Sequence, residues 1–359
     1  MEPTPPKTDA PLLSYSVAQS TTDTPILNLP PAFMPPVAQE TVPAATPVLP
    51  QKLLGMATLA LLFFASAGLT AAYLTNAANA NSQIQVAAAA ATVDQFATLA
   101  LHAQAAYVLD LTTGQVLYEH NPDVQLPLAS LTKVALTLAL AEVLSPTSVV
   151  SVPPHTTPDG APKRLPDGSL WHAQDLIDFT LVSSSNEGAE VLASSADPLV
   201  HRAYPQSQAK GATLWRMNDL ARALGLTHTY FVNTSGLDES PTQAGAYGSA
   251  RDVAVLFAYA ASTSPASFEG TSREGFVFKS IDGAKATVVN TDTIAGDIPG
   301  LVMGKTGSTE LAGGNLAVIF DVGPARPIVA VVLHSTQEGR FEDMKKLVAA
   351  AQATVAQER

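Results

Sequence analysis

The longest apolar run in the chain lies near its amino-terminal end. Residues 53–74 form a stretch of 22 residues with no charged side chain, and the next charge after them is Asp94. As a helix this run would be roughly 33 Å long, which is enough to cross a bilayer's hydrocarbon core of about 30 Å. The pattern therefore predicts a transmembrane helix rather than a helix buried inside a soluble domain.

The flanks of this run indicate how it would sit in a membrane. Ala78-Asn79-Ala80 has the form of a signal-peptide cleavage site, but the apolar run and the tail before it are too long, which favours an uncleaved signal anchor. Lys52 precedes the run and no Lys or Arg lies near its other end. The positive-inside rule then predicts a single-pass protein of the cytoplasmic membrane with a cytoplasmic amino terminus and an extracytoplasmic remainder, in the periplasm or at the cell exterior.

The segments on either side of the run differ from a globular domain. Residues 1–50 carry twelve prolines, five charged side chains and no apolar periodicity, so we expect a disordered, proline-rich cytoplasmic tail. Residues 75–100 change from polar to alanine-rich and are predicted to be a linker. The catalytic chemistry is then expected within residues 101–359.

Short apolar runs and turn residues divide residues 101–359 into strands and helices. The expected elements are a hairpin of strands 106–109 and 115–118, a buried helix over 130–144, an edge strand over 300–308, two strands over 315–322 and 327–334, and a helix from Phe341. Strands at both ends of a domain with helices between them predict an α/β (α+β) fold. Its sheet would be mostly antiparallel, with helices on both faces.

Composition narrows the classes of function. The chain has 359 residues, 19 basic against 31 acidic side chains and no cysteine. A net charge of −12 has the wrong sign for a nucleic-acid partner, and thiolate chemistry is excluded. The seven histidines form no His-x-x-x-His pair or His-Glu-x-x-His helix. We therefore expect neither a metal nor another cofactor.

The first candidate motif is Ser130-Leu-Thr-Lys133 at the head of the predicted buried helix. Its spacing places a hydroxyl and an amine on one helical face. A lysine can activate a serine nucleophile if burial or a nearby cation lowers the pKa of the lysine. A second Ser-x-x-Lys, at Ser207 and Lys210, lies in a polar stretch and is interpreted as surface.

Two further motifs supply the groups that such a nucleophile needs. Ser184-Ser-Asn186 offers a hydroxyl for proton relay and an amide for substrate contact. Lys305, Thr306 and Gly307 offer a carboxylate site on an edge strand, and the N–H of Ser308 would pair with that of Ser130 as an oxyanion hole. The glycine spacing before Lys305 is one residue too short for a nucleotide-binding P-loop.

These three motifs in this order resemble the penicilloyl-serine transferases, and within them the D-alanyl-D-alanine carboxypeptidases, or low-molecular-weight penicillin-binding proteins. Other similar stretches are AAYVLDLTTGQVLYEHNPDVQLPLASLTK, DLIDFTLVSSSNEGAEVLA, FVNTSGLDES, GSARDVAVLFAYA, MGKTGSTELAGGNLAV and GRFEDMKKL. The resemblance implies a β-lactamase/transpeptidase-like fold with a five-stranded sheet and a mainly helical subdomain. It also implies removal of the terminal D-alanine from peptidoglycan stem peptides, with β-lactams as acylating inhibitors.

The resemblance also implies a role for each matching residue. Ser130 would be the nucleophile and Lys133 its base, Ser184 and Asn186 would serve proton relay and substrate contact, and Lys305, Thr306, Gly307 and Ser308 would form the substrate-binding strand. Arg340, in GRFEDMKKL, falls where the family has an arginine that holds the substrate carboxylate. Ser185 stands where these enzymes usually have glycine, so we expect it to narrow the pocket.

Several alternatives remain open on the same scaffold. A β-lactamase would need a glutamate that activates water, and the nearest candidate, Glu310 with Asn315, has the wrong spacing. The sequence does not separate a carboxypeptidase from a DD-endopeptidase acting on cross-linked peptides. A non-catalytic penicillin-sensing or wall-binding module is disfavoured by the intact Ser130, Lys133 and Lys305.

Overall fold

A five-stranded antiparallel sheet forms the centre of the protein in a computed structural model, which describes residues 94–154, 157, 160, 163–323 and 325–358. Its strand order is β10-β11-β12-β1-β2. The strands are β1 (Ala105–Asp110), β2 (Val116–His120), β10 (Leu301–Thr309), β11 (Gly313–Asp321) and β12 (Pro327–Ser335). Every neighbouring pair is antiparallel. Because β10 stands at one end of the strand order, it is an edge strand, as the sequence predicted.

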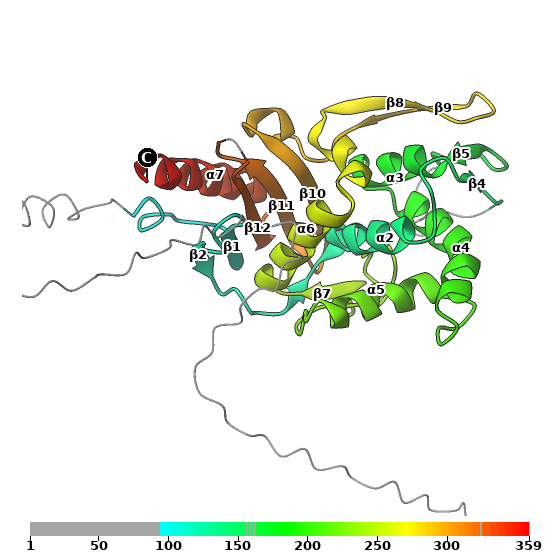
Figure 1. The fold of residues 1–359 in the computed structure, drawn as a ribbon, viewed down its shortest axis with the longest axis horizontal. Helices are drawn as coiled ribbons and strands as arrows, with labels where there is room; N and C mark the ends of the chain where they lie inside the picture. The colour runs from blue at the N-terminus through cyan, green and yellow to red at the C-terminus, as the bar shows by residue number, and fades with distance from the viewer. Residues whose placement is uncertain (1–93, 155–156, 158–159, 161–162, 324, 359) are drawn as a thin grey trace, which may run out of the picture. The chain divides into compact units, whose positions relative to one another are not determined.

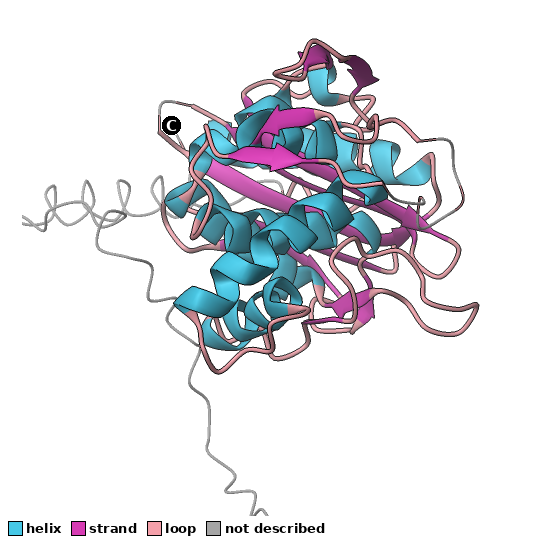
Figure 2. Ribbon diagram, turned by 90° about the vertical axis from the view of Figure 1, so that its right-hand side faces the viewer, coloured by secondary structure: helices cyan, strands magenta, loops and turns pink. Residues whose placement is uncertain are grey.

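Alternating side chains of these strands build two separate cores. Tyr107 and Val331 belong to the core shared with α2 (Thr132–Ala141) and α6 (Ala250–Thr263). Their neighbours Val108 and Val332 belong to the core on the other face, which is covered by α7 (Gly339–Gln357). Figures 1 and 2 show the strands between these layers of helices. The prediction of an antiparallel sheet with helices on both faces is confirmed.

A mainly helical part surrounds α2, in which every residue but Ala141 is buried. This part is visible at the end of the molecule away from α7 (Figure 1). Its helices are α3 (Ala173–Val182), α4 (Asn186–Ala203) and α5 (Ala212–Ala223). The short strands outside the main sheet are β3 (Leu126–Pro127), β4 (Val149–Ser151), β5 (Leu170–His172), β6 (Tyr230–Phe231), β7 (Ala246–Gly248), β8 (Gly275–Lys279) and β9 (Lys285–Val289). The 3₁₀ turns are η2 (Ala129–Leu131), η3 (Pro265–Ser267), η4 (Glu269–Ser272) and η5 (Ala295–Asp297).

Two boundaries differ from the sequence prediction. The helix expected over 130–144 begins as the 3₁₀ turn η2 and ends at Ala141. Phe96, which the prediction placed in the linker, is buried and stacks on Tyr118 with ring centroids 5.3 Å apart. The folded part therefore begins before residue 101, because this aromatic side chain closes one end of the core beneath α7.

The expected tail over 1–50 and the expected membrane span over 53–74 lie outside the described residues. Within the described ranges, no helix combines the length and the apolar composition that crossing a membrane requires.

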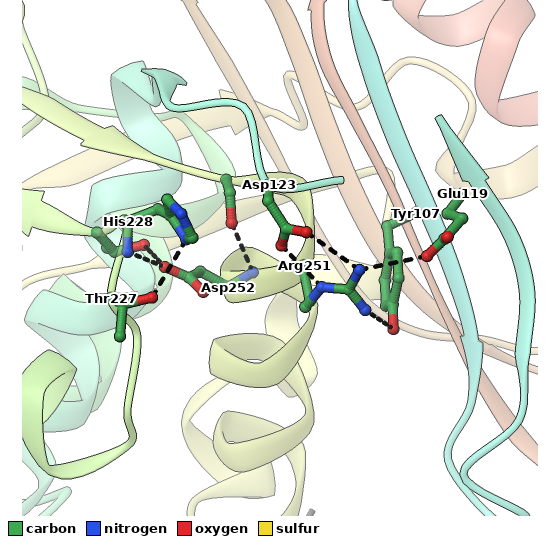
Figure 3. Close-up of polar contacts among 9 residues, drawn as sticks. Tyr107, Glu119, Asp123, Thr227, His228, Arg251 and Asp252 are labelled. Atoms are coloured by element: carbon green, nitrogen blue, oxygen red, sulfur yellow. Dashed lines mark hydrogen bonds and ion pairs between the residues drawn. The ribbon is translucent and has the colours of Figure 1, made fainter. Parts of the chain in front are cut away.

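The amino-terminal end of α6 fastens the segment that leads to Ser130. Arg251 donates hydrogen bonds to Asp123 at 2.8 Å and to the Tyr107 hydroxyl at 3.0 Å, and Asp252 accepts from the backbone N–H of His228 at 2.8 Å (Figure 3). The hydrogen bond from Arg251 also holds the pKa of Asp123 below its usual value. These contacts hold the segments before β3 and β6 against α6, and β3 runs directly into the turn that carries Ser130.

Candidate active site

Ser130 and Lys133 face each other at the start of α2. The Lys133 Nζ lies 2.8 Å from the Ser130 Oγ, 2.8 Å from the Asn186 Oδ1 and 2.8 Å from the Ser235 carbonyl oxygen. Lys133 is fully buried, whereas Ser130 is half-buried. This burial provides the desolvation that the sequence argument required of a lysine acting as a base.

The partners of Lys133 fix the direction in which an uncharged amine would point. An amide oxygen and a carbonyl oxygen only accept hydrogen bonds, so Asn186 and Ser235 would take the two N–H groups of a neutral amine. Its lone pair would then face the Ser130 hydroxyl, 2.8 Å away. The geometry is suited to removing the proton of Ser130.

The turn that presents Ser130 is held from several sides. Ala129 has a φ of 48°, in the left-handed region that is unfavourable for residues other than glycine. The Asn315 side chain donates to the carbonyl oxygens of Pro127 and Leu128 at 2.9 and 3.1 Å, and the Thr132 hydroxyl donates to that of Ala129 at 2.7 Å. These hydrogen bonds offset the cost of the unusual backbone conformation.

The second motif occupies the corner between α3 and α4. Ser184 has a φ of 57°, and its hydroxyl accepts a hydrogen bond from Lys305 at 2.8 Å. Asn186 is the first residue of α4 and faces Lys133. Ser185 points elsewhere: it is buried and its Oγ caps α4 by accepting from the Gly188 N–H at 3.0 Å. Its side chain is therefore used by the helix end, which differs from the expectation that Ser185 narrows the pocket.

Strand β10 carries the third motif along the edge of the sheet. Lys305 is buried and donates to Ser184 and, at 2.7 Å, to the carbonyl oxygen of Thr306. Burial, reinforced by the neighbouring Arg340 charge, lowers the pKa of Lys305 to about 7. A Cβ on Gly307 would lie 2.7 Å from the Leu128 carbonyl oxygen and 3.3 Å from the Ser130 nitrogen. Only glycine lets the strand pass this close to Ser130.

Of the two remaining predicted residues, Arg340 contacts strand β10 from the start of α7 and Ser308 lies on the strand itself. The Arg340 guanidinium donates to the carbonyl oxygen of Gly307 at 3.1 Å and stacks over Phe341. Desolvation lowers the pKa of Arg340. Ser308 continues β10 beyond Gly307 and is exposed. All nine predicted residues thus belong to four segments, the start of α2, the corner between α3 and α4, strand β10 and the start of α7, while their individual roles stay predictions.

The second Ser-x-x-Lys does not form a comparable pair. Ser207 is buried, so its assignment to the surface is wrong; its hydroxyl donates to the Tyr204 carbonyl oxygen at 2.7 Å in the turn after α4. Lys210 is exposed. The Ser207 hydroxyl is buried because it closes this turn. Within the described residues, no hydrogen bond joins it to a buried lysine.

Sequence reasoning missed three residues that shape the site. Ser235 contributes a backbone oxygen, Asn315 holds the turn before Ser130, and the Thr291 hydroxyl lies 2.6 Å from that of Thr306. The stretch FVNTSGLDES contains Ser235 and was noted only for its resemblance to the family. A backbone carbonyl leaves no side-chain signal, so its part in the site emerges only from the fold.

The chain matches known proteins over most of its folded part. Residues 88–337 match the family model for D-alanyl-D-alanine carboxypeptidases of the peptidase S11 type. The chain is 32% identical over 238 residues to the D-alanyl-D-alanine carboxypeptidase DacB2 of Mycobacterium tuberculosis, an alignment that covers 66% of this chain and 77% of that protein. It is 27% identical over 260 residues to DacA of Escherichia coli strain K12, covering 69% of this chain but only 60% of DacA.

A solved structure is similar to this chain in its overall fold. Penicillin-binding protein D2 of Listeria monocytogenes, in its ampicillin-bound form, is similar to this chain with a TM-score of 0.58 and 29% sequence identity. The superposition covers 70% of this chain and 98% of that one. The similarity thus includes nearly the whole of a protein described by its ability to bind penicillin.

Proposed function

This chain belongs to the D-alanyl-D-alanine carboxypeptidase family, and we propose that it removes the terminal D-alanine from peptidoglycan stem peptides through an acyl-serine intermediate. The observation that carries the proposal is the buried Lys133 amine, 2.8 Å from the Ser130 hydroxyl and held by two acceptor oxygens.

The first half of the reaction forms the acyl-enzyme. Lys133 takes the proton of Ser130 as the Ser130 oxygen bonds to the carbonyl carbon of the penultimate D-alanine. The carbonyl oxygen gains negative charge, for which the N–H groups of Ser130 and Ser308 are the proposed donors, each worth roughly 3 to 4 kcal/mol in the transition state. The C–N bond then breaks, and the proton reaches the leaving amine through Ser184.

The second half restores the enzyme. Water adds to the ester carbonyl, Lys133 takes the proton of that water, and the C–O bond to Ser130 breaks as the serine regains its proton. Lys305, Thr306 and Arg340 supply charge and hydrogen bonds along the strand where the substrate carboxylate would lie. A β-lactam that carries a carboxylate at the matching position would acylate Ser130 by the same route.

The acidic residue next to the second motif supports a carboxypeptidase over a β-lactamase. Glu187 is buried, and its two carboxylate oxygens accept the N–H groups of Arg164 at 3.0 Å and Leu165 at 3.2 Å. Both carboxylate oxygens of Glu187 therefore bind backbone N–H groups, whereas a β-lactamase uses a glutamate to activate water.

Intact-mass spectrometry of the full-length chain tests this proposal. Incubation with benzylpenicillin should add one penicilloyl group, and Ser130→Ala should abolish the adduct while Ser207→Ala retains it. Lys133→Ala should slow acylation by roughly 10²- to 10⁴-fold, the usual contribution of a positioned base. An adduct that survives Ser130→Ala would overturn the assignment of the nucleophile, and an unchanged rate in Lys133→Ala would overturn that of the base.

The leaving group separates the two peptidase activities. The full-length chain should release free D-alanine from a diacyl-D-Ala-D-Ala peptide and from monomeric muropeptides. Cleavage of cross-linked muropeptides without release of D-alanine from monomers would favour the endopeptidase instead. Slow acylation with no turnover of either substrate would favour a penicillin-sensing module.

We also propose that the catalytic part lies outside the cytoplasmic membrane, anchored through residues 53–74. The support is the uncharged length of that run and the single lysine, Lys52, at its amino-terminal end. Peptidoglycan substrates lie on that side of the membrane, so the anchor would keep the site near them.

A further inference from the structure

Thr291 connects strand β10 to the corner that carries the second motif. Its hydroxyl lies 2.6 Å from the hydroxyl of Thr306, and its backbone N–H donates to the carbonyl oxygen of Val182 at 3.1 Å. Val182 is the last residue of α3 and stands two positions before Ser184. Thr291 therefore spans the same gap that Lys305 crosses with its hydrogen bond to Ser184.

The backbone around Thr291 is fixed by its neighbour. Asn290 is buried, and its side-chain amide donates to the carbonyl oxygens of Thr271 at 2.9 Å and Arg273 at 2.8 Å. Its Oδ1 accepts the N–H of Asp292 at 2.9 Å. Because these hydrogen bonds hold the residues on both sides of Thr291, its hydroxyl stays in contact with Thr306.

The number of protons on the two hydroxyls limits what Thr306 can do. Each hydroxyl carries one proton, and a carboxylate offers acceptors only. If Thr306 donates to Thr291, it has no proton left for a substrate carboxylate. If Thr291 donates to Thr306, the proton of Thr306 is available for the substrate.

The surroundings of Thr291 allow the second arrangement. The Val182 carbonyl oxygen already receives the Thr291 N–H at 3.1 Å, while the Thr291 hydroxyl is 3.5 Å from that oxygen, at the limit of a hydrogen bond. The 2.6 Å contact with Thr306 is much shorter. The Thr291 proton can therefore be given to Thr306 at little cost.

We infer that Thr291 is a positioning residue for substrate-carboxylate recognition, since its hydroxyl donates to Thr306 and directs the Thr306 proton toward the carboxylate of the bound peptide or β-lactam. This inference rests on the proposed function. It adds a residue outside the three motifs to the recognition of the substrate terminus.

The test compares a carboxylate ligand with the same ligand lacking its charge. In the full-length chain, Thr291→Val should lower the second-order rate constant for acylation by benzylpenicillin by roughly 3- to 10-fold, the value of one hydrogen bond. The rate constant for benzylpenicillin methyl ester should change much less. Thr291→Ser should restore the wild-type ratio of the two, and with a diacyl-D-Ala-D-Ala peptide Thr291→Val should raise KM more than it lowers kcat.

Thr293→Val is the matched control, because Thr293 is an exposed threonine on the same segment. It should leave both rate constants unchanged. Equal losses for the acid and the ester in Thr291→Val, or no rescue by Thr291→Ser, would show that Thr291 only supports the fold and would overturn the inference. If the wild-type chain is not acylated by either compound, the proposed function fails instead.

Discussion

At the residue scale, two serines cap helices in the same way but at different distances from the site. Ser185 caps α4 by accepting from Gly188, and Ser249 caps α6 by accepting from Asp252. Either serine replaced by alanine should lower the free energy of unfolding by about 0.5 to 2 kcal/mol. Because the Ser185 side chain is turned into its helix, acylation by benzylpenicillin should be as little affected in Ser185→Ala as in Ser249→Ala.

Denaturant unfolding and acylation kinetics of the two variants check this prediction together. A much slower acylation in Ser185→Ala alone would mean that its hydroxyl also acts on the substrate. Equal acylation rates in the two variants would show that Ser185 affects the stability of α4 and not the reaction.

The charge of Lys305 gives the site a dependence on pH. Burial and Arg340 lower its pKa to about 7, while the nearby Asp292 carboxylate opposes this shift. Asp292 is itself buried, with one carboxylate oxygen that has no hydrogen-bond partner within the described segments, and burial raises its pKa to about 6. As the pH rises through about 7, the free enzyme loses the charge of Lys305, one of the two positive charges proposed to attract a carboxylate.

We therefore expect the rate constant for acylation by benzylpenicillin to fall as the pH rises above about 7. Asp292→Asn removes a negative charge that favours protonated Lys305, so the pKa of Lys305 should fall and the decline should begin at lower pH. Stopped-flow acylation between pH 5 and 9 measures both profiles. The methyl ester is the control, because an uncharged ligand should not follow the charge of Lys305; a shift to higher pH in Asp292→Asn would contradict the assignment.

At the scale of elements, the loop after β6 is packed against the turn that carries Ser130. Gly236 has a φ of 82°, and a Cβ there would overlap the carbonyl oxygen of Ala129. Asn233 holds this loop by accepting the Gly236 N–H at 2.7 Å. The loop places the Ser235 oxygen on Lys133, so its position affects the base directly.

Gly236→Ala should therefore be far more damaging than Gly225→Ala. Gly225 also has a positive φ, of 71°, but no atom within 4 Å of the added Cβ, so the change should cost about 1 to 2 kcal/mol in stability through backbone strain alone. Gly236→Ala should cost roughly 1 to 3 kcal/mol more through overpacking and slow acylation by up to about 10²-fold. Thermal unfolding and acylation rates measure both; equal effects in the two variants would show that the contact with Ala129 is unimportant.

The elements also show why part of the site could be predicted and part could not. Lys133 and Lys305 are unusual residues within apolar segments, and the sequence places each on the correct helix or strand. Ser235 acts through its backbone, which every residue type offers, and Thr291 matters only because the fold brings it against Thr306. The serine run before α4 is compatible both with a helix cap and with pocket residues, and only the direction of the Ser185 side chain separates the two.

At the scale of the whole molecule, the site is assembled across the boundary between the sheet and the helical part. Lys133 binds Asn186 from within the helices, while Lys305 reaches from the edge strand to Ser184. Both lysines are buried, and the residues they reach are two positions apart in the same corner. The proposed nucleophile therefore depends on how the two parts pack, because the packing brings together residues that are far apart in the chain.

The proposed membrane anchor is a property of the whole chain that experiment can decide. Full-length protein should stay with membranes after alkaline carbonate extraction, because residues 53–74 are uncharged over the length of a bilayer core. Two arginines, in Leu61→Arg and Phe63→Arg, should each cost about 2.5 to 3.5 kcal/mol of insertion free energy and release the protein. The same change at Leu12 and Leu13, in the proline-rich tail, should leave it membrane-bound.

The same variants test the orientation of the proposed anchor in the membrane. A reporter enzyme that works only outside the cytoplasm, fused after Arg359, should be active in the wild-type chain and inactive in the variant with arginines at positions 61 and 63. Activity of a cytoplasm-specific reporter would reverse the topology, and a shortened soluble product beginning after Ala80 would identify a cleaved signal peptide. The proposed anchor would keep the catalytic part at the outer face, within reach of its substrate. Releasing it should therefore reduce its action on the wall in cells, while its kinetics on soluble peptides stay the same.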